Sequence, residues 1–315
     1  MDKDTTLHDV IIVGGGPAGL TAAVYAARKM LKVLLITQNI GGQALYSLDV
    51  ENYMGYQFIS GQDLMDRFEK QVEKYNVKNV FSEVKSVTKE NEVFITRSTN
   101  GDEYHGKAII IATGKKSRTL NAKGLDRLIG RGVSYCATCD APLFMGLDVV
   151  VVGGGNSAIT AAYELTSIAR QVYLVNRGPL KADEIYLEKI RDAPNIKCFI
   201  GYELVEVTGE DALDAAALRN LSDDSSVVLP VAGVFIEIGL IPNSDMVKDL
   251  VLLNKNDEIV VSYDCSTSLP GVFAAGDVTT VPEKQIIVAA GEGAKAAISA
   301  YKYILKEGEH AETSY

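Results

Sequence analysis

The stretch DVIIVGGGPAG, residues 9–19, decides the fold. Residues 9–13 are an apolar run with β-branched side chains, which is typical of a strand buried on both faces of a parallel sheet. The motif Gly14-x-Gly16-x-x-Gly19 follows directly, and residues 20–29 have the pattern of a helix. A strand, a glycine turn and a helix in this order predict a dinucleotide-binding unit, because the turn brings backbone N–H groups close to a pyrophosphate.

The same unit occurs twice in the chain. Residues 9–36 align without a gap with residues 148–175, so that each residue of the first copy has a counterpart 139 positions later. Two copies predict two bound nucleotides. The last motif position is Gly19 in the first copy and Ala158 in the second. Glycine suits tight helix packing around an embedded flavin nucleotide, whereas alanine is common where a nicotinamide nucleotide binds and leaves.

Composition limits the classes of function. The 315 residues can build two domains, and 47% hydrophobic with 23% charged residues is the balance of an ordinary globular protein. A formal net charge of −10 argues against nucleic acid as a partner, because phosphate contacts need a basic surface. The uncharged run 10–27 is interrupted by Gly14-Gly15-Gly16-Pro17, which would break a membrane helix. With no basic region leading into an apolar signal, we expect a cytoplasmic protein with no membrane partner.

A second decisive stretch is Cys136-Ala137-Thr138-Cys139-Asp140. Two cysteines separated by two residues indicate a redox couple or half of a metal site. Structural zinc needs about four N or S ligands, but Cys198 and Cys265 each lie alone in an apolar, strand-like run and the three histidines are far apart. We therefore expect no metal and a redox-active pair, placed shortly before Gly153 opens the second nucleotide motif.

Further segments complete the two units. Helices are predicted at residues 63–75 and 285–304, the second with small residues near its start where a flat ring could lie close to the backbone. Strands are predicted at residues 32–36, 77–99, 107–114, 172–175, 194–207, 226–239 and 269–276.

Several polar positions follow these strands. Gly41-Gly42-Gln43 suits a backbone loop lying against a planar ring, or is simply a turn. Asp277 at the end of a strand can accept a hydrogen bond from a ribityl or ribose hydroxyl, or cap a helix. Thr37 stands where a ribose-binding acid is usual. Arg177 indicates a nucleotide phosphate or is a solvated surface charge.

Taken together, these motifs resemble the low-molecular-weight thioredoxin reductases over nearly the whole chain. The disulfide spacing just before the second nucleotide motif is highly specific, because glutathione-reductase-like enzymes have a wider spacing in the flavin domain. The resemblance implies an α/β fold of two Rossmann-like dinucleotide-binding domains, the second inserted into the first. The implied FAD-binding domain comprises 1–116 and 245–315, and the NAD(P)-binding domain with the disulfide comprises 117–244. A homodimer is also implied.

The resemblance assigns nucleotide-binding residues position by position. FAD is expected at Gly14, Gly16, Pro17, Ala18, Gly19, Gly41, Gly42, Gln43, Asn52, Ala112, Thr113, Gly114, Gly276, Asp277, Gln285 and Ile286. NADPH or NADH is expected at Gly153, Gly155, Asn156, Ser157, Ala158, Arg177 and Lys181.

The resemblance also implies the activity of a thioredoxin-disulfide reductase. Electrons would pass from NAD(P)H through FAD to the Cys136/Cys139 pair, and then to a thioredoxin or thioredoxin-like protein. Cys139 would face the flavin, Cys136 would attack the partner disulfide, and Asp140 would protonate the leaving thiolate, a role that needs a pKa raised by burial. Because cysteines and nicotinamide site share one domain, we expect domain rotation about residues 115–116 and 242–243.

The sequence leaves more than one electron donor and more than one class of substrate open. The NADPH signature of the family, His-Arg-Arg and a further Arg, is replaced by Asn176-Arg177-Gly178 and Lys181. Residues 180–183 are closer to the flavoprotein of alkyl hydroperoxide reductase, which prefers NADH but carries an acid where Asn176 stands. Some anaerobic relatives use ferredoxin or a deazaflavin. A flavin-dependent dithiol oxidase of a small molecule would have a small hydrophobic pocket beside Cys136, whereas a protein substrate would need an open surface there. A non-catalytic flavoprotein would show no turnover with any electron donor.

Overall fold

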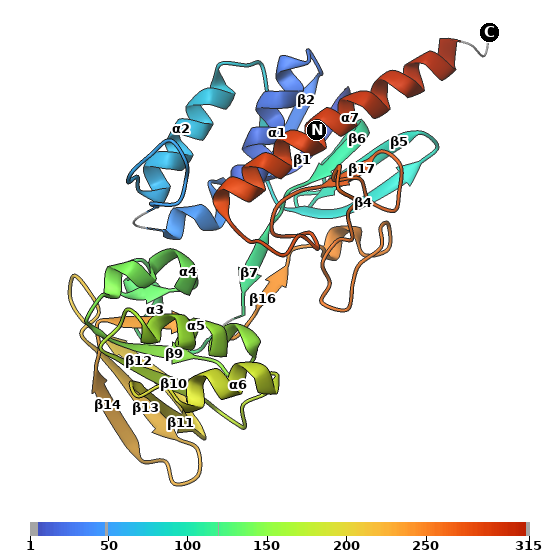
Figure 1. Cartoon of the computed structure of the whole chain (residues 1–315). Coiled ribbons are helices and arrows are strands. Elements are labelled where there is room, and N and C mark those ends of the chain that lie inside the picture. Colours follow the sequence, from blue (N-terminus) through green and yellow to red (C-terminus); the bar gives the residue numbers. More distant parts are fainter. Residues whose placement is uncertain (1–5, 48–49, 119, 313–315) are drawn as a thin grey trace. The chain divides into compact units, whose positions relative to one another are not determined.

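The computed structural model describes residues 6–47, 50–118 and 120–312, which form two compact units (Figure 1). Unit 1 takes in residues up to 45, then 53–116, then 241 onward, and unit 2 takes in 46–52 and 117–240. The predicted α/β fold with parallel sheets is confirmed. Two differences from the expected boundaries stand out: residues 241–244 belong to unit 1, and the short segment 46–52 belongs to unit 2.

The central sheet of unit 1 is mostly parallel. Its strand order is β3-β2-β1-β6-β5-β4, and β17 pairs with the end of β6. The parallel strands are β1 (Leu7–Gly15), β2 (Val33–Ile40), β3 (Lys78–Phe81), β6 (Glu103–Ile111) and β17 (Val272–Ala274); the antiparallel ones are β4 (Val84–Glu90) and β5 (Val93–Ser98). In the register, Val13 lies beside both Ile36 and Ile111. The glycine turn after β1 therefore leaves the sheet level with the ends of its two neighbours.

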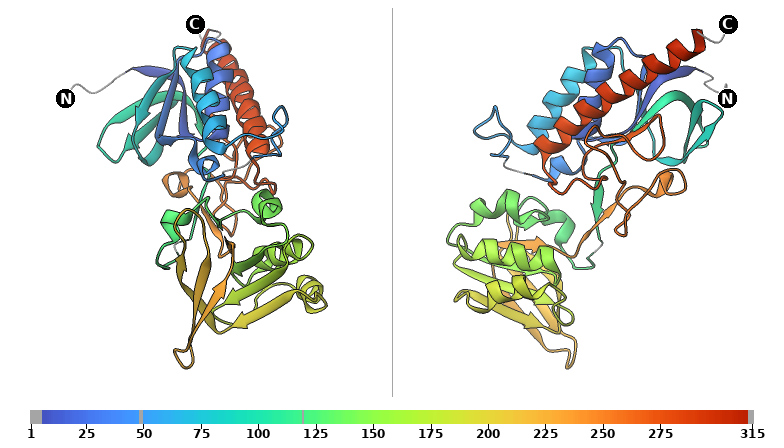
Figure 2. Two further views of the ribbon diagram at one scale, coloured as in Figure 1. Left: turned by 90° about the vertical axis from the view of Figure 1, so that its left-hand side faces the viewer. Right: turned by 45° about the vertical axis from the view of Figure 1, so that its right-hand side comes forward.

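Three helices of unit 1 lie side by side on one face of this sheet (Figure 2). They are α1 (Pro17–Arg28), α2 (Gly61–Glu73) and α7 (Ile286–Glu312). Ser60 caps α2 by accepting a hydrogen bond from the Asp63 N–H at 3.0 Å. The α1–α7 approach is close, because a Cβ added at Gly293 would lie 2.0 Å from the Ala18 carbonyl oxygen.

The other face of the sheet is covered by the segment after the return from unit 2. Alternate residues of β1, β2 and β6 point to this face, as the two-residue period of a strand requires. They pack against Val247, Val251 and Ile259, which are all buried and lie in or after the short helix η3 (Asp245–Val247). Both faces are therefore buried, which explains the continuous apolar runs in the sequence.

Unit 2 repeats the parallel arrangement with five strands in the order β11-β10-β9-β15-β8. These are β8 (Val133–Ser134), β9 (Asp148–Val152), β10 (Gln171–Asn176), β11 (Ile196–Ile200) and β15 (Gly233–Ile236). The helices are α3 (Leu125–Leu128), α4 (Ala137–Asp140), α5 (Asn156–Thr166) and α6 (Glu184–Arg191), with the 3-10 helix η2 (Ala141–Phe144). The strand β9, turn and helix α5 reproduce β1, turn and α1, as the internal repeat predicts.

A second, antiparallel sheet of unit 2 contains a strand that the sequence pattern did not indicate. The sheet consists of β12 (Tyr202–Thr208), β13 (Ala215–Asn220) and β14 (Ser226–Pro230). The central strand β13 has the sequence AAALRN, whose alanines favour helix in isolation. Pairing on both sides overrides that local preference.

The two crossings of the chain between the units pair with each other as β7 (Lys115–Ser117) and β16 (Leu240–Pro242).

One expectation was wrong in detail: Cys198 does lie in a strand, but Cys265 lies in a turn with φ +67°. None of the helices in the described part of the chain combines the length and apolarity that a membrane crossing requires. Across the same residues, no cluster of three His, Cys, Asp or Glu side chains is placed to hold a metal ion.

Candidate functional site

The first glycine turn is shaped by close backbone packing at two of its glycines. Gly14 has φ +112°, and a Cβ there would lie 2.3 Å from the Ala112 carbonyl oxygen. A Cβ at Gly19 would lie 1.8 Å from the Gly14 carbonyl oxygen. Gly16 is different, because its nearest neighbour would be the Gly41 oxygen at 4.0 Å. Gly14 and Gly19 are thus required by the chain itself, while Gly16 leaves open space where a pyrophosphate can approach the start of α1.

The loop at residues 41–43 lies against this turn. Gly41 and Gly42 have φ of +104° and +56°, and the Gly41 N–H donates to the Gly15 oxygen at 2.8 Å. The 3-10 helix η1 (Gly42–Tyr46) begins here, and the Gln43 side-chain amide donates to the Lys115 carbonyl oxygen. The sequence-predicted Gly41, Gly42 and Gln43 are therefore brought next to the first nucleotide turn.

Two more predicted segments reach the same edge of the sheet. Ala112, Thr113 and Gly114 follow β6, and the Thr113 hydroxyl donates to the Asn243 carbonyl oxygen at 2.6 Å. Gly276 follows β17, and its N–H donates to the buried Glu292 carboxylate at 2.9 Å. Glu292, on α7, was not predicted from the sequence. It fixes the loop that carries Asp277.

A charged cluster surrounds Asp277. Lys115 contacts Glu258 at 2.6 Å and Lys284 contacts the same carboxylate at 3.6 Å, with all three side chains mostly buried. Burial raises the pKa of the Asp277 carboxyl, and the positive charges of Lys284 and Lys115 oppose that rise. No sequence motif singles out Lys115, Glu258 or Lys284, because they are far apart in the chain.

The geometry of unit 1 fits an FAD. The motif Gly14–Gly19, the 41–43 loop, the residues after β6 and the residues after β17 all lie at the carboxyl ends of neighbouring parallel strands, where nucleotides bind in such sheets. Gln285 and Ile286 stand at the start of α7, against which Gly276 packs through Ala289. Asn52 lies in the segment 46–52, which is grouped with unit 2.

The redox pair of unit 2 is a closed disulfide between Cys136 and Cys139. Cys136 stands immediately before α4, and its sulfur accepts a hydrogen bond from the Cys139 N–H at 3.2 Å. Ser134 donates its hydroxyl to the Asp140 carboxylate at 2.6 Å and accepts from the Cys136 N–H at 3.0 Å. Ser134 therefore links the acid to the cysteine that precedes the helix. No motif in the sequence pointed to this serine.

The second glycine turn repeats the first with more room. Gly153 has φ +148°, and a Cβ there would lie 2.2 Å from the Glu237 carbonyl oxygen and 2.8 Å from the Ala158 methyl. Ala158 thus fits where Gly19 does not tolerate a side chain, because the backbone contact of the first copy is absent. Gly155 has no atom within 4 Å of its Cβ position, so the start of α5 is open to a phosphate.

The loop after β10 is tied down by its own side chains. Asn176 donates its amide to the carbonyl oxygens of Gly178 and Pro179 at 2.6 and 3.1 Å. Arg177 contacts Glu203 at 3.4 Å, and Lys181 donates its N–H to the Gly154 oxygen at 2.7 Å. The structure therefore places the predicted Arg177 beside an acid instead of leaving it unpaired.

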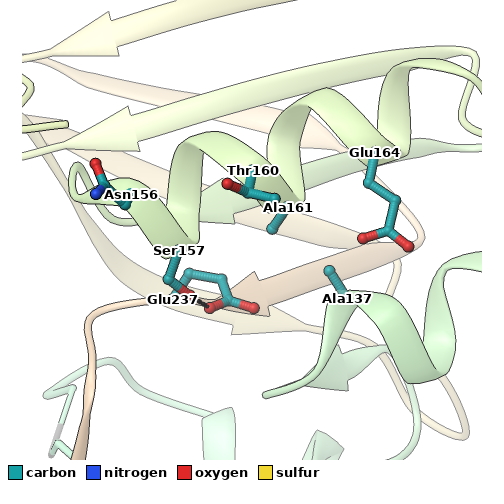
Figure 3. A pocket seen from close by; sticks show the side chains of 7 residues that line it. All are labelled: Ala137, Asn156, Ser157, Thr160, Ala161, Glu164 and Glu237. Carbon is teal, nitrogen blue, oxygen red and sulfur yellow. Dashed lines mark hydrogen bonds between the residues drawn. The ribbon is translucent and has the colours of Figure 1, made fainter. Parts of the chain in front are cut away.

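A pocket of about 250 Å³ lies between α5 and the first residue of α4 (Figure 3). The Ser157 hydroxyl donates to the Glu237 carboxylate inside it. Burial raises the pKa of Glu237, the hydrogen bonds from Ser157 and the Ala137 N–H oppose the rise, and the charge of Glu164 adds to it. The lining residues are Ala137, Asn156, Ser157, Thr160, Ala161, Glu164 and Glu237. Two carboxylates, those of Glu164 and Glu237, therefore line the pocket together with hydroxyl and methyl groups.

Sequence comparison supports the geometry. The model of the pyridine nucleotide-disulphide oxidoreductase family matches residues 8–293. The F component of alkyl hydroperoxide reductase from Pseudomonas putida is 40% identical over 303 residues, which are 95% of this chain and 58% of that protein. A protein named NADH dehydrogenase from Ferdinandcohnia aciditolerans is 35% identical, covering 99% of this chain and 60% of that protein. The chain therefore spans about three fifths of the length of these curated relatives.

Structural comparison points the same way. The crystal structure of thioredoxin reductase from Streptococcus pyogenes superposes with a TM-score of 0.91 at 36% identity, covering 95% of this chain and 99% of that one. The paired cysteines, the two nucleotide turns and these similarities all indicate the same family. The chain therefore belongs to the pyridine nucleotide-disulphide oxidoreductases, flavin-dependent enzymes acting on sulfur groups, and within them it resembles the low-molecular-weight thioredoxin reductases.

Proposed function

We propose that the protein reduces the disulfide of a thioredoxin-like protein with electrons from NADH, using FAD and the Cys136–Cys139 pair. The observation that carries this proposal is the disulfide itself, held by Ser134 and α4 in the same unit as the second nucleotide turn. When bound, FAD accepts a hydride from a nicotinamide and returns an electron pair to a disulfide. FAD binds to the strand ends of unit 1 described above, and the nicotinamide nucleotide binds at Gly153–Ala158.

The sulfur chemistry follows from thiol–disulfide exchange. The Cys136 thiolate attacks one sulfur of the partner disulfide, and the other partner sulfur leaves as a thiolate. Cys139 then attacks the Cys136 sulfur, which releases the second partner thiolate and restores the internal disulfide. Asp140 delivers a proton to a leaving thiolate, and the Ser134 hydroxyl orients its carboxyl group. Two electrons and two protons thus reach the partner.

We expect Asp140→Asn to lower the turnover of the protein disulfide about 10²-fold, because general acid catalysis contributes at least that much. Ser134→Ala should cause a smaller loss of the same kind, since it removes the hydrogen bonds to the Asp140 carboxylate and from the Cys136 N–H but leaves the acid itself. Both variants should keep wild-type rates of flavin reduction, followed by stopped flow. Equal turnover of Asp140→Asn and wild type with oxidised thioredoxin would remove Asp140 from the mechanism.

A protein substrate is supported over a small dithiol. Leu143 and Met145, within six residues of Cys139, have exposed fractions of 42% and 75%. These two side chains offer apolar contact area to a protein partner close to the disulfide. The flavin-dependent dithiol oxidase is therefore the less favoured interpretation.

NADH is supported over NADPH by the loop after β10. The Arg177 guanidinium contacts Glu203 at 3.4 Å, and the same carboxylate binds Arg219, so part of the positive charge of this loop is already neutralised. The Glu203 carboxylate competes with a phosphate for these arginines, while the Asn176 side-chain oxygen can accept a hydrogen bond from a ribose hydroxyl. The relative named NADH dehydrogenase agrees with this choice.

We expect NADH to bleach the flavin about ten to a hundred times faster than NADPH at equal low concentration. The reason is that the 2'-phosphate of NADPH would lose water without gaining a charge-assisted hydrogen bond to Arg177, and such a bond is worth about 1.5–3 kcal/mol. The measurement is anaerobic mixing of the yellow protein with each donor. Glu203→Gln is the matched variant. It should bring the bleaching rates with NADH and NADPH closer together, because it releases Arg177 to bind the 2'-phosphate of NADPH. Faster bleaching by NADPH, or bleaching by reduced ferredoxin alone, would overturn the choice of donor.

A second candidate function is favoured by the identity to the F component of alkyl hydroperoxide reductase. In that case the electrons delivered to a thioredoxin-like protein would end on a peroxidase disulfide and then on a peroxide. The two functions share every step inside this chain. Coupled assays with oxidised thioredoxin and with an oxidised peroxidase of that system distinguish them by which acceptor is reduced faster.

The assembly and motion of the enzyme are parts of the same proposal. We take the protein as a cytoplasmic homodimer, as the family resemblance implies, and sedimentation of the FAD-loaded protein tests the dimer. Rotation about residues 115–116 and 242–243 would let the disulfide and the nicotinamide reach the flavin in turn. Crystals grown with and without nucleotide test the rotation, and an unchanged domain angle with full turnover would count against it.

A further inference from the structure

The repeat gives Glu237 a counterpart in unit 1. Val13 and Val152 are equivalent positions, and they lie in register with Ile111 and Ile236. The next residue in each strand, Ala112 or Glu237, donates its N–H to that valine at 2.8 Å in both units. A methyl group at the edge of the first nucleotide site is thus replaced by a carboxylate at the edge of the second.

The strand order fixes which half of a dinucleotide faces Glu237. The loop after β10 meets the ribose of the adenosine half, and the start of α5 meets the pyrophosphate. β10 lies on one side of β9 and β15 lies on the other. The nicotinamide half must therefore leave the pyrophosphate on the β15 side, where Glu237 is the first residue after the strand.

The pocket at this position carries negative charge. Glu237 and Glu164 both line it, and among the described residues of the lining none is Lys or Arg (Figure 3). The Glu237 carboxylate is fixed in place by the Ser157 hydroxyl and the Ala137 N–H, two donors that oppose the rise in its pKa caused by burial. A reduced nicotinamide ring is neutral, whereas the oxidised ring carries a positive charge.

We propose that Glu237 makes the second nucleotide site discriminate between the oxidation states of the nicotinamide, binding the cationic oxidised ring more tightly than the neutral reduced ring. This inference rests on the proposed use of NADH. By thermodynamic linkage, tighter binding of the oxidised form shifts the bound nucleotide toward hydride donation by the same factor. Glu237 is in this sense a specificity-determining residue, and Glu164 adds to its field.

Binding of two probes to the oxidised, FAD-loaded protein tests the proposal. The probes are NAD⁺ and tetrahydro-NAD, whose ring is neutral and cannot donate a hydride, and their Kd values are measured by calorimetry. Glu237→Gln should weaken NAD⁺ about tenfold, which is about 1.4 kcal/mol, and change tetrahydro-NAD by less than about twofold. Glu206→Gln, an acid of the same unit outside the pocket lining, is the control and should change neither Kd.

The outcomes separate the inference from the proposed function. An equal rise in the Kd of NAD⁺ and of tetrahydro-NAD in Glu237→Gln would mean that the residue only shapes the site. That result would contradict the inference but not the proposed use of NADH. Failure of wild type to bind either nucleotide would overturn both. If Glu237→Gln does not fold, Glu237→Ala introduces the residue found at the counterpart position 112 and should show the same selective loss of NAD⁺.

Discussion

Replacing both Cys136 and Cys139 by serine should lower reduction of a thioredoxin-like disulfide by at least about 10³-fold, while FAD binding and flavin reduction by NADH stay at wild-type levels. The reason is that a hydroxyl is neither a useful nucleophile toward a disulfide nor an electron carrier, so no route remains from flavin to partner. Removal of a nucleophile commonly costs a factor of this size or more.

Steady-state assays check this prediction with two acceptors in parallel. Oxidised thioredoxin reports the sulfur route, and a dye that accepts electrons directly from reduced flavin reports the rest of the enzyme. Cys198→Ser, which changes an exposed cysteine outside the disulfide, is the control and should match wild type with both acceptors. Thioredoxin reduction that survives in the double variant would show that the disulfide is not on the electron path.

The second large effect concerns two glycines of one turn. Gly19→Ala should lower the free energy of unfolding by about 3 kcal/mol and abolish FAD retention, because the new methyl would meet the Gly14 carbonyl oxygen at 1.8 Å. Gly16→Ala should leave the apoprotein within about 0.5 kcal/mol of wild type. Its backbone has φ −81°, which any residue adopts, and its nearest neighbour is 4.0 Å away.

FAD distinguishes the two variants. If the pyrophosphate lies over Gly16, the added methyl in Gly16→Ala should weaken FAD binding about 10²-fold although the apoprotein is stable, since a displaced charge-assisted contact is worth about 1.5–3 kcal/mol. Urea unfolding of apoprotein and fluorescence titration with FAD measure the two quantities. FAD binding by Gly16→Ala as tight as that of wild type would show that the pyrophosphate does not lie over Gly16.

The parts of the fold that depend on local pattern could be predicted from the sequence. Buried parallel strands and glycine turns leave strong signals, and the repeat predicted both nucleotide units because the same backbone packing recurs at Gly14 and Gly153. The family resemblance and the redox pair are confirmed by the comparisons and by the Cys136–Cys139 disulfide.

Other features depend on contacts between distant residues and had no local signal. β13 is a strand because β12 and β14 flank it, against the helical preference of its alanines. Cys265 looked like a strand residue because its neighbours are apolar, but a turn with φ +67° holds it. Glu237 stood in an ordinary strand-like run. Only the fold shows its carboxylate beside Ser157 and the start of α4.

Anaerobic reductive titration of the purified FAD-loaded protein tests most directly whether the flavin exchanges electrons with the sulfur pair. Each chain should take up two electrons for the flavin and two for the disulfide before the visible absorbance is fully bleached. The Cys136→Ser, Cys139→Ser double variant should bleach after two. Complete bleaching of wild type after only two electrons, with the disulfide still intact, would contradict the account.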